Sequence, residues 1–163
     1  MTDARNSSSP ILPIRATLGR PSLGVVAAIA VVAVALIPLA ALMAQTAAAP
    51  FTVVGTNRGY ATLQEAVDAI GSGEGSIAIA PGTYRQCVVQ TQGRVAFLAT
   101  EPGKVEFTGT ACEGKAAFVL RGAEASVSGI IFSDISVPDG NGAGIRQEAG
   151  TLTVANSWFR NSE

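Results

Sequence analysis

Apolar positions recur at a nearly fixed spacing along the second half of this chain. The stretch 118–127 (FVLRGAEASV) aligns without gaps with 145–154 (IRQEAGTLTV) at an offset of 27 residues, and with 88–97 (VVQTQGRVAF) at an offset of 30. A repeat of this length indicates stacked units that bury one continuous core. Three columns of apolar residues coincide in the copies: Val88, Phe118 and Ile145; Val95, Ala125 and Leu152; Phe97, Val127 and Val154.

The register continues beyond these stretches, since Phe132 aligns with Phe159 and Asp134 with Asn161. From residue 51 onward, short β-rich runs alternate with glycine or polar corners, a pattern typical of strands joined by tight turns. We expect strands within 51–54, 76–80, 83–90, 95–99, 104–108, 116–120, 126–132, 144–146 and 151–155.

One helix is predicted ahead of the repeats. Thr62 and Glu65 have the spacing of a capping box, in which each side chain bonds the backbone of the other residue. Apolar residues then recur at helical spacing, which predicts a short amphipathic helix over 63–70. The glycine-rich stretch 71–75 ends it.

These elements predict an all-β fold, a parallel β-helix solenoid with a short N-terminal capping α-helix. A solenoid needs such a cap because its first coil would otherwise expose strand edge and apolar core. The alternative is an all-β sandwich, which predicts hairpin turns of the Asn-Gly or Asp-Gly type. Only 139–142 (DGNG) fits that requirement, and a sandwich does not predict a gapless self-alignment.

The first 49 residues have the pattern of an export segment. Arg5, Arg15 and Arg20 precede an uncharged apolar run over 23–44, and three alanines follow at 47–49. The run also reaches the roughly 20 residues needed to span a bilayer. We therefore expect 1–49 to contact the membrane, either as a cleavable signal peptide or as an anchor helix over 23–44. The positive N-terminal side predicts that the remainder is exported, to the periplasm or beyond the cell, or is held at the membrane surface.

Composition narrows the function of the expected domain, 50–163. The 163 residues include no histidine, which excludes Ser-His-Asp catalysis, Cys-His catalysis and His-ligated zinc within them. Because Arg5, Arg15, Arg20 and Asp3 lie before the domain, 8 of 11 basic and 11 of 12 acidic residues remain, a net charge of −3. A domain of this charge lacks the basic surface that nucleic-acid binding requires.

Two cysteines, Cys87 and Cys112, form an even pair in a chain expected to enter an oxidising compartment. Each lies just before one of two adjacent repeat copies, so stacking would bring them together. We expect a disulfide; two unpaired buried thiols are the alternative.

The stretch 60–84 resembles the opening of pectin-lyase-like, right-handed parallel β-helix proteins. In that family a helix with the motif A-T-[IL]-Q-x-A-[IV] leads to a strand and a P-G-T-Y turn, and here 61–67 reads ATLQEAV and 81–84 reads PGTY. The stretches 141–148 (NGAGIRQE) and 152–161 (LTVANSWFRN) are similar to a middle coil of the same group. The resemblance covers about 51–163, and its motifs are specific for the fold more than for an activity.

The resemblance implies a role with extracytoplasmic polysaccharide, either binding or depolymerisation by a lyase or a hydrolase. The family also includes many proteins with no assigned reaction, so a non-catalytic module for surface binding or assembly is the alternative. Lyases of this family use Arg or Lys as a base with acidic residues holding Ca²⁺, and hydrolases use paired carboxylates.

Asp134, Arg146 and Glu148 are the candidate catalytic residues. Arg146 and Glu148 are two apart and would share one face of a strand. Arg121 and Glu148 occupy the same repeat position in successive coils, about 5 Å apart between backbones, which is near enough for an ion pair. The alternative for these charges is an exposed ladder without catalytic function.

Arg121 and Trp158 are the candidate substrate-binding residues, Trp158 as an outward platform for a sugar ring beside a core Phe159. Asp139 and Asn141, in a glycine-rich stretch, are the candidate metal ligands, and Ca²⁺ is the cation that their oxygens would take. That stretch lacks the alternating acidic positions and the closing Glu of a calcium loop, so a polar corner is the alternative. No cofactor is evident from the sequence.

The last predicted strand lies close to Glu163. An uncovered last coil would expose apolar core and an unpaired strand edge. We therefore expect the chain to be the N-terminal portion of a longer β-helix, with a partner chain over the last coil as the alternative.

Overall fold

The computed structural model describes residues 49–163, which fold mostly as β-strands in three sheets with one helix. Sheet A contains β1 (Phe51–Val53), β2 (Arg58–Tyr60), β3 (Glu74–Ile79), β6 (Arg94–Ala99), β9 (Glu124–Ser128) and β12 (Thr151–Ala155). Sheet B contains β4 (Gly82–Tyr84), β7 (Val105–Thr108), β10 (Ile130–Ser133) and β13 (Trp158–Arg160). Sheet C contains β5 (Val88–Gln90), β8 (Ala116–Leu120) and β11 (Ala143–Gln147).

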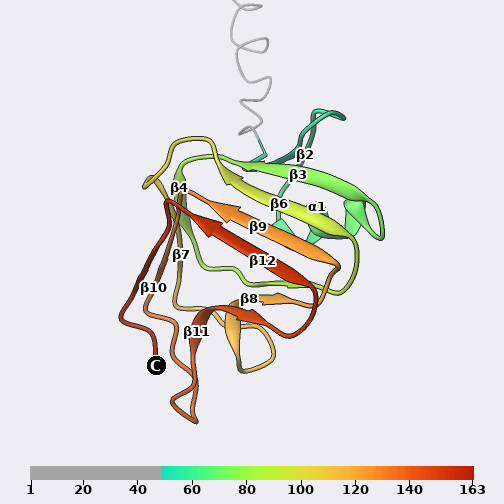
Figure 1. Ribbon diagram of the computed structural model, residues 1–163. Coiled ribbons are helices and arrows are strands. Elements are labelled where there is room, and N and C mark those ends of the chain that lie inside the picture. The colour runs from blue at the N-terminus through green and yellow to red at the C-terminus, as the bar shows by residue number, and fades with distance from the viewer. Residues whose placement is uncertain (1–48) are drawn as a thin grey trace, which may run out of the picture. The chain divides into compact units, whose positions relative to one another are not determined.

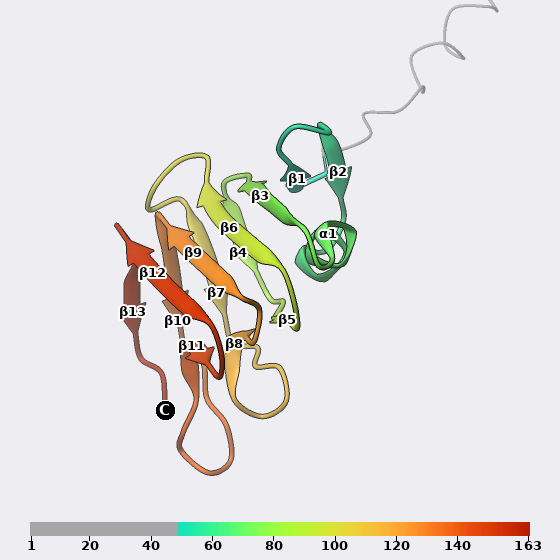
Figure 2. The same ribbon diagram turned by 45° about the vertical axis from the view of Figure 1, so that its right-hand side comes forward.

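From β3 onward the chain visits sheets A, B and C in a fixed order, and each return adds a parallel strand beside the previous one. In Figures 1 and 2, β3, β6, β9 and β12 lie side by side as a ladder that runs from green to red. This arrangement is compatible with a β-solenoid. The antiparallel hairpins of a sandwich are not found between β3 and β13, where the paired strands are parallel.

The pairing confirms the register predicted from the apolar repeat. Phe118 of β8 pairs with Val88 on one side and Ile145 on the other. The other predicted columns are also strand partners: Val95, Ala125 and Leu152; Phe97, Val127 and Val154; Phe132 and Phe159. The coil length is therefore set by the repeat seen in the sequence.

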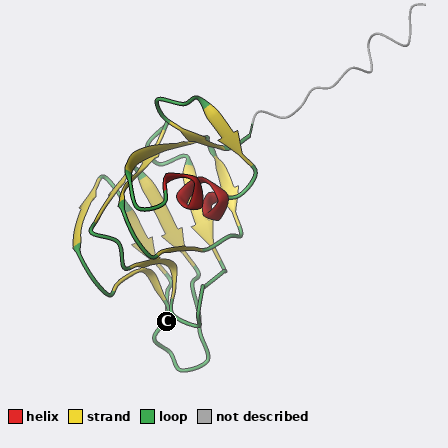
Figure 3. Ribbon diagram, turned by 90° about the vertical axis from the view of Figure 1, so that its right-hand side faces the viewer, coloured by secondary structure: helices red, strands yellow, loops and turns green. Residues whose placement is uncertain are grey.

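The helix α1 (Leu63–Ile70) begins and ends where predicted. Its capping box is formed, since the Thr62 side chain accepts from the backbone of Glu65 and the Glu65 side chain accepts from the backbone of Thr62. Burial of Leu63, Ala66 and Val67 places its apolar side on the core, and Figure 3 shows α1 lying across the interior of the coils.

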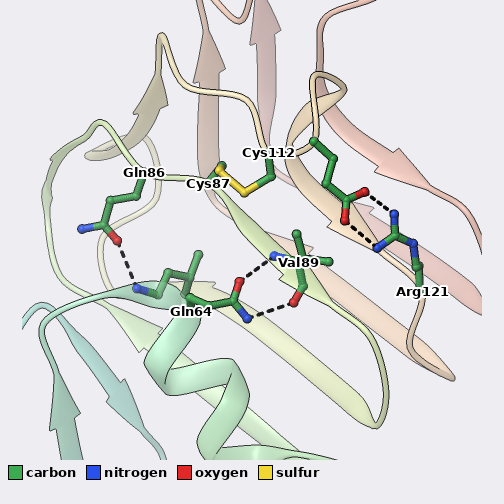
Figure 4. Close-up of a disulfide and its surroundings, with 8 residues drawn as sticks. Gln64, Gln86, Cys87, Val89, Cys112 and Arg121 are labelled. Atoms are coloured by element: carbon green, nitrogen blue, oxygen red, sulfur yellow. Dashed lines mark hydrogen bonds and ion pairs between the residues drawn. A yellow bond between two sulfur atoms is a disulfide. The ribbon is translucent and has the colours of Figure 1, made fainter.

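Gln64 of α1 pairs with the edge of sheet C as a strand would. Its side-chain amide donates to the carbonyl of Val89 at 3.0 Å and accepts from the backbone N–H of Val89 at 2.8 Å (Figure 4). Gln86 completes the junction by accepting from the backbone N–H of Leu63 at 3.1 Å. The cap thus covers apolar core and also satisfies the free backbone groups of β5.

The structure differs from the predicted strands at four places. Residues 58–60, expected in a loop, form β2 and pair with β1. Residues 158–160, beyond the last expected strand, form β13. The run 83–90 is divided into β4 and β5, and the run 126–132 is divided into β9 and β10 at Gly129. Gly129 has a φ of 78°, and a Cβ there would lie 3.0 Å from the Cβ of Ala99. A one-residue corner of this kind divides the run and shifts the inward alternation, which passes from Ala125 and Val127 to Ile130 and Phe132.

Aromatic rings form a continuous column inside sheet B. Tyr84, Phe107, Phe132 and Phe159 are partners in successive strands, with ring centroids 5.3, 6.2 and 5.1 Å apart. Phe118 of sheet C packs edge-on against Phe107 and Phe132 at 4.9 and 5.0 Å. These rings join two sheets into one core.

The last coil leaves inward-facing residues uncovered among the described residues. Phe159 stacks on Phe132 but is 52% exposed, and Val154 is 41% exposed although Val127 beneath it is buried. Phe159 was expected in the core, and it points inward as predicted. It stays half exposed because no further described strand lies over β13.

The predicted disulfide between Cys87 and Cys112 is present, with a Cα–Cα distance of 5.4 Å (Figure 4). It links the segments that lead into β5 and β8, which are neighbouring strands of sheet C.

The expected signal or anchor helix over 23–44 lies outside the described residues. Within 49–163, the structure contains no helix with the length and apolar character needed to cross a membrane.

Replacing Phe132 by Ala should lower the free energy of unfolding by about 3–5 kcal/mol, because it leaves a cavity in the aromatic column. Urea unfolding monitored by circular dichroism measures the change. Trp158→Ala removes a larger ring from the outer face of the same sheet and should cost about 1 kcal/mol or less. Equal losses of unfolding free energy in the two variants would contradict the conclusion that the aromatic column is the centre of the core.

Candidate functional site

Arg121 and Glu148, predicted as neighbours in successive coils, form an ion pair with Arg121 Nε 2.6 Å from Glu148 Oε2. They belong to a ring of four charges that also contains Glu113 and Lys115. Lys115 Nζ lies 2.6 Å from Glu148 Oε1 and 3.5 Å from Glu113 Oε2. Arg121 (Figure 4) donates through Nη1 to Glu113 Oε1 at 3.0 Å and through Nη2 to the other oxygen. Each cation therefore contacts both carboxylates.

The pairing shifts each group toward its charged form. Hydrogen bonds to Glu113 and Glu148 raise the pKa of Arg121, while bonds from Lys115 and Arg121 lower the pKa of Glu148. The pKa of Glu113 is lowered in the same way, chiefly by Arg121. An arginine that acts as a base needs a lowered pKa, and the pKa of Arg121 is raised. The four charges are therefore suited to linking neighbouring coils by ion pairs and not to removing a proton.

The three candidate catalytic residues lie in different places. Asp134 follows β10 at a corner, where its carboxylate accepts from Thr108 Oγ1 at 3.4 Å and from Asn161 Nδ2 at 3.3 Å. Arg146 lies on β11 and donates to the carbonyl of Asn141 at 3.2 Å. Glu148 follows the end of β11, in the ring of four charges. No hydrogen bond or ion pair among the described residues joins any two of Asp134, Arg146 and Glu148.

Asp139 and Asn141 form a local turn. Asp139 Oδ1 accepts from the backbone N–H of Asn141 at 3.1 Å, and the Asn141 amide donates back to the carbonyl of Asp139 at 3.4 Å. Within residues 49–163, no three acidic, cysteine or histidine side chains come together as a metal-binding group. Calcium binding at this turn stays a prediction from sequence.

Trp158 lines a shallow pocket of about 340 Å³ on the outer face of sheet B, with Gly103, Ile131, Phe159 and Arg160. We call this the Trp158 pocket. The indole is 52% exposed and lies over Gly103, where the Cβ of any larger residue would be 3.6 Å from the ring. Such a Cβ would make ordinary van der Waals contact with the ring, and glycine is favoured here by its positive φ of 76°.

A charged pair borders the Trp158 pocket. Arg160 Nη2 lies 2.7 Å from Glu106 Oε1, which also accepts from Ser133 Oγ at 2.7 Å. These bonds, from Ser133 first and Arg160 second, lower the pKa of Glu106. The pocket therefore combines an aromatic surface with fixed polar groups, a combination suited to a ligand with both apolar and hydroxyl faces.

A second hollow, which the sequence reasoning missed, lies on the outer face of sheet A and has a volume of about 440 Å³. We call it the sheet A groove. One row of its lining is charged (Glu74, Arg94 and Glu124), a second row is small (Ser76, Ala96 and Ser126), and Val54 comes from the loop after β1. Members of each row are partners in β3, β6 and β9.

A signal for this groove was present in the sequence. Arg94 and Glu124 align at the same offset of 30 that revealed the apolar columns. The same register predicted the pair of Arg121 and Glu148, but it was not applied to the outward residues at 94 and 124. Glu74 was harder to assign to this row, because the first coil is shorter. Glu74 and Arg94 are 20 residues apart, whereas the apolar columns repeat at 27 and 30.

Comparison of the chain with protein-family models, with curated proteins and with solved structures found no match.

Replacing Glu148 by Gln should destabilise the protein at neutral pH and have progressively less effect in acid. The folded-state pKa of Glu148 lies below its ordinary value of 4.5, so its contribution is fully present above that pH and is lost as the pH falls through the lowered value. Urea midpoints measured across a pH series give the difference. Glu101→Gln, the same change at an exposed position, should have little effect at any pH. A Glu148 effect that persists unchanged in strong acid would contradict the ion-pair explanation.

Proposed function

We propose that this protein is an exported, right-handed parallel β-helix of the pectin-lyase-like type that binds extracytoplasmic polysaccharide. The observation that carries the proposal is the Trp158 pocket, an exposed indole beside the pair of Arg160 and Glu106. A sugar ring has an apolar C–H face and a polar rim, so it can stack on the indole while its hydroxyls bond the charged pair.

Two features support the β-helix interpretation. Each connection leaves one strand of a sheet and returns to a parallel neighbour in that sheet, and such crossovers are right-handed in about 98% of cases. Of the two motifs that carry the family resemblance, the helix occurs as α1 ahead of the first complete coil, and the P-G-T-Y motif at 81–84 contributes β4 to that coil.

Export is supported by the disulfide between Cys87 and Cys112, because such bonds persist in oxidising compartments outside the cytoplasm. The apolar run over 23–44 would direct the chain there, as a signal or as an anchor.

Binding is favoured over depolymerisation because the candidate catalytic groups are dispersed or already paired. Asp134 and Glu148 occupy different corners of the coil, whereas a glycoside hydrolase needs two carboxyl groups about 5–10 Å apart across the scissile bond. Lyase or hydrolase activity remains the enzymatic alternative. Release of reducing ends or of unsaturated uronates on incubation with polysaccharide would establish that alternative.

Assembly is the second candidate function, and the last coil favours it. Phe159 and Val154 face inward but stay half exposed, and the edges of β11, β12 and β13 have no described partner. Further coils or a partner chain would cover this surface.

Trp158→Ala should weaken binding of the full chain to its polysaccharide about tenfold, since it removes the stacking surface. Affinity electrophoresis in gels containing a neutral glucan, a polyuronate or an amino-sugar polymer identifies the polymer and measures the loss. Trp158→Phe keeps an aromatic surface and should retain most of the affinity. Leu98→Ala, an exposed apolar truncation on sheet A, is the matched control. Retention of full affinity by Trp158→Ala would exclude the pocket as the binding surface.

A further inference from the structure

The sheet A groove lies on a different sheet from the Trp158 pocket and has a different chemical character. We infer that this groove is a second binding site, which holds an amino-sugar unit through its protonated amine. The choice of a sugar among amine-bearing ligands rests on the proposed polysaccharide function, whereas the preference for an amine rests on the groove itself.

The charges of the groove leave one carboxylate without an ion-pair partner. Glu74, Arg94 and Glu124 are adjacent in register across three parallel strands. Arg94 Nη1 lies 2.7 Å from Glu124 Oε2, whereas Glu74 makes no ion pair with any residue in the described part of the chain. The row therefore carries one net negative charge, and that charge lies at Glu74.

This arrangement disfavours an anionic sugar. A uronate carboxylate in the groove would be the third carboxylate in a row that holds one cation, and it would share Arg94 with Glu124. Like charges placed together weaken an interface. The net charge of −3 on the exported domain acts in the same direction.

An ammonium group meets the opposite situation. It can bind Glu74 without displacing an existing pair, and a bond between an ammonium and a carboxylate is among the stronger hydrogen bonds in proteins. Glu124 is also accessible, since its side chain is 51% exposed and exposed ion pairs are individually weak. A ligand amine can therefore compete with Arg94 for Glu124 as well.

The floor of the groove suits a sugar ring. Ser76 and Ser126 present hydroxyls that can donate and accept, and Ala96 between them keeps the floor low. Val54 is 53% exposed at the wall and offers apolar contact to a C–H face. Neighbouring strands lie about 4.8 Å apart, similar to the length of one sugar unit in an extended chain. A ligand laid across β3, β6 and β9 would thus meet one strand per unit, and the volume of about 440 Å³ lies within the range of small-molecule sites.

Calorimetric titration of the full chain with a glucosamine hexamer and with the N-acetylated hexamer tests the inference. The two differ in the amine charge, and the glucosamine oligomer should bind more tightly. Glu74→Gln should weaken glucosamine binding about three- to tenfold, while Glu101→Gln, which makes the same charge change outside the groove, should not. Arg94→Gln should strengthen it, because the variant releases Glu124 and removes the only cation in the row.

Several results would overturn the inference. These are equal affinity for the two hexamers, equal losses in Glu74→Gln and Glu101→Gln, and weaker binding in Arg94→Gln. Loss of glucosamine binding in Trp158→Ala with no change in Glu74→Gln would assign the sugar to the Trp158 pocket, so the proposed function would stand and the inference would fail. Binding that depends on Glu74 and persists in Trp158→Ala would support the inference even if the Trp158 pocket bound no polymer. A lysine peptide that binds as tightly as the glucosamine oligomer would overturn the assignment to a sugar.

Discussion

The constraint on which the rest of this structure depends is that each inward side chain lies on its equivalent in the neighbouring coil. In sheet B this gives the column from Tyr84 to Phe159, and in sheet A the columns through Val95 and Phe97. A parallel strand can add to the stack only if its inward residues match those beneath in position. A one-residue slip would turn every inward residue outward, so the apolar columns fix the register.

The same constraint explains why the N-terminal end needs a specialised cap. Nothing within a stack of coils ends it, because each coil presents free strand edges to which a further coil can pair. Here α1 covers the apolar interior, Gln64 bonds the edge of sheet C at Val89, and β1 pairs with the edge of sheet A. The motif around Gln64 is therefore explained by hydrogen bonding, independently of any family resemblance.

The sequence predicted the elements that depend on apolar spacing. The register of Val88, Phe118 and Ile145 and the disulfide follow from positions in the repeat. The bounds of α1 follow from its capping box and from apolar residues at helical spacing. The corner at Gly129 was missed, although the shift of inward positions from Ala125 and Val127 to Ile130 and Phe132 marks it in the sequence. Among outward residues, the ion pair of Arg121 and Glu148 was predicted because both occupy one repeat position. It was harder to predict which other outward residues join that pair. Outward side chains are not held in columns by core packing, and they can bond to neighbours in the same coil or in the next one. Lys115, for example, joins Arg121 around Glu148 from the turn just before β8, at a position that no apolar column marks.

Because inward side chains form the core and outward side chains face solvent, residues that bind a ligand can lie on the outer face without affecting the core. An outward residue on a central strand has fixed neighbours on the adjacent strands, at a spacing of about 4.8 Å. Glu74, Arg94 and Glu124 form such a row, and a substitution in it changes the charge presented to solvent without opening a cavity in the core.

Trp158 differs because it lies on β13, the last strand of sheet B, where Phe159 beside it is also exposed. A row on interior strands has neighbours on both sides, whereas Trp158 has a strand neighbour on one side only. The sheet A groove is therefore built on strands that are paired on both sides, whereas Trp158 is held by strand pairing on one side only.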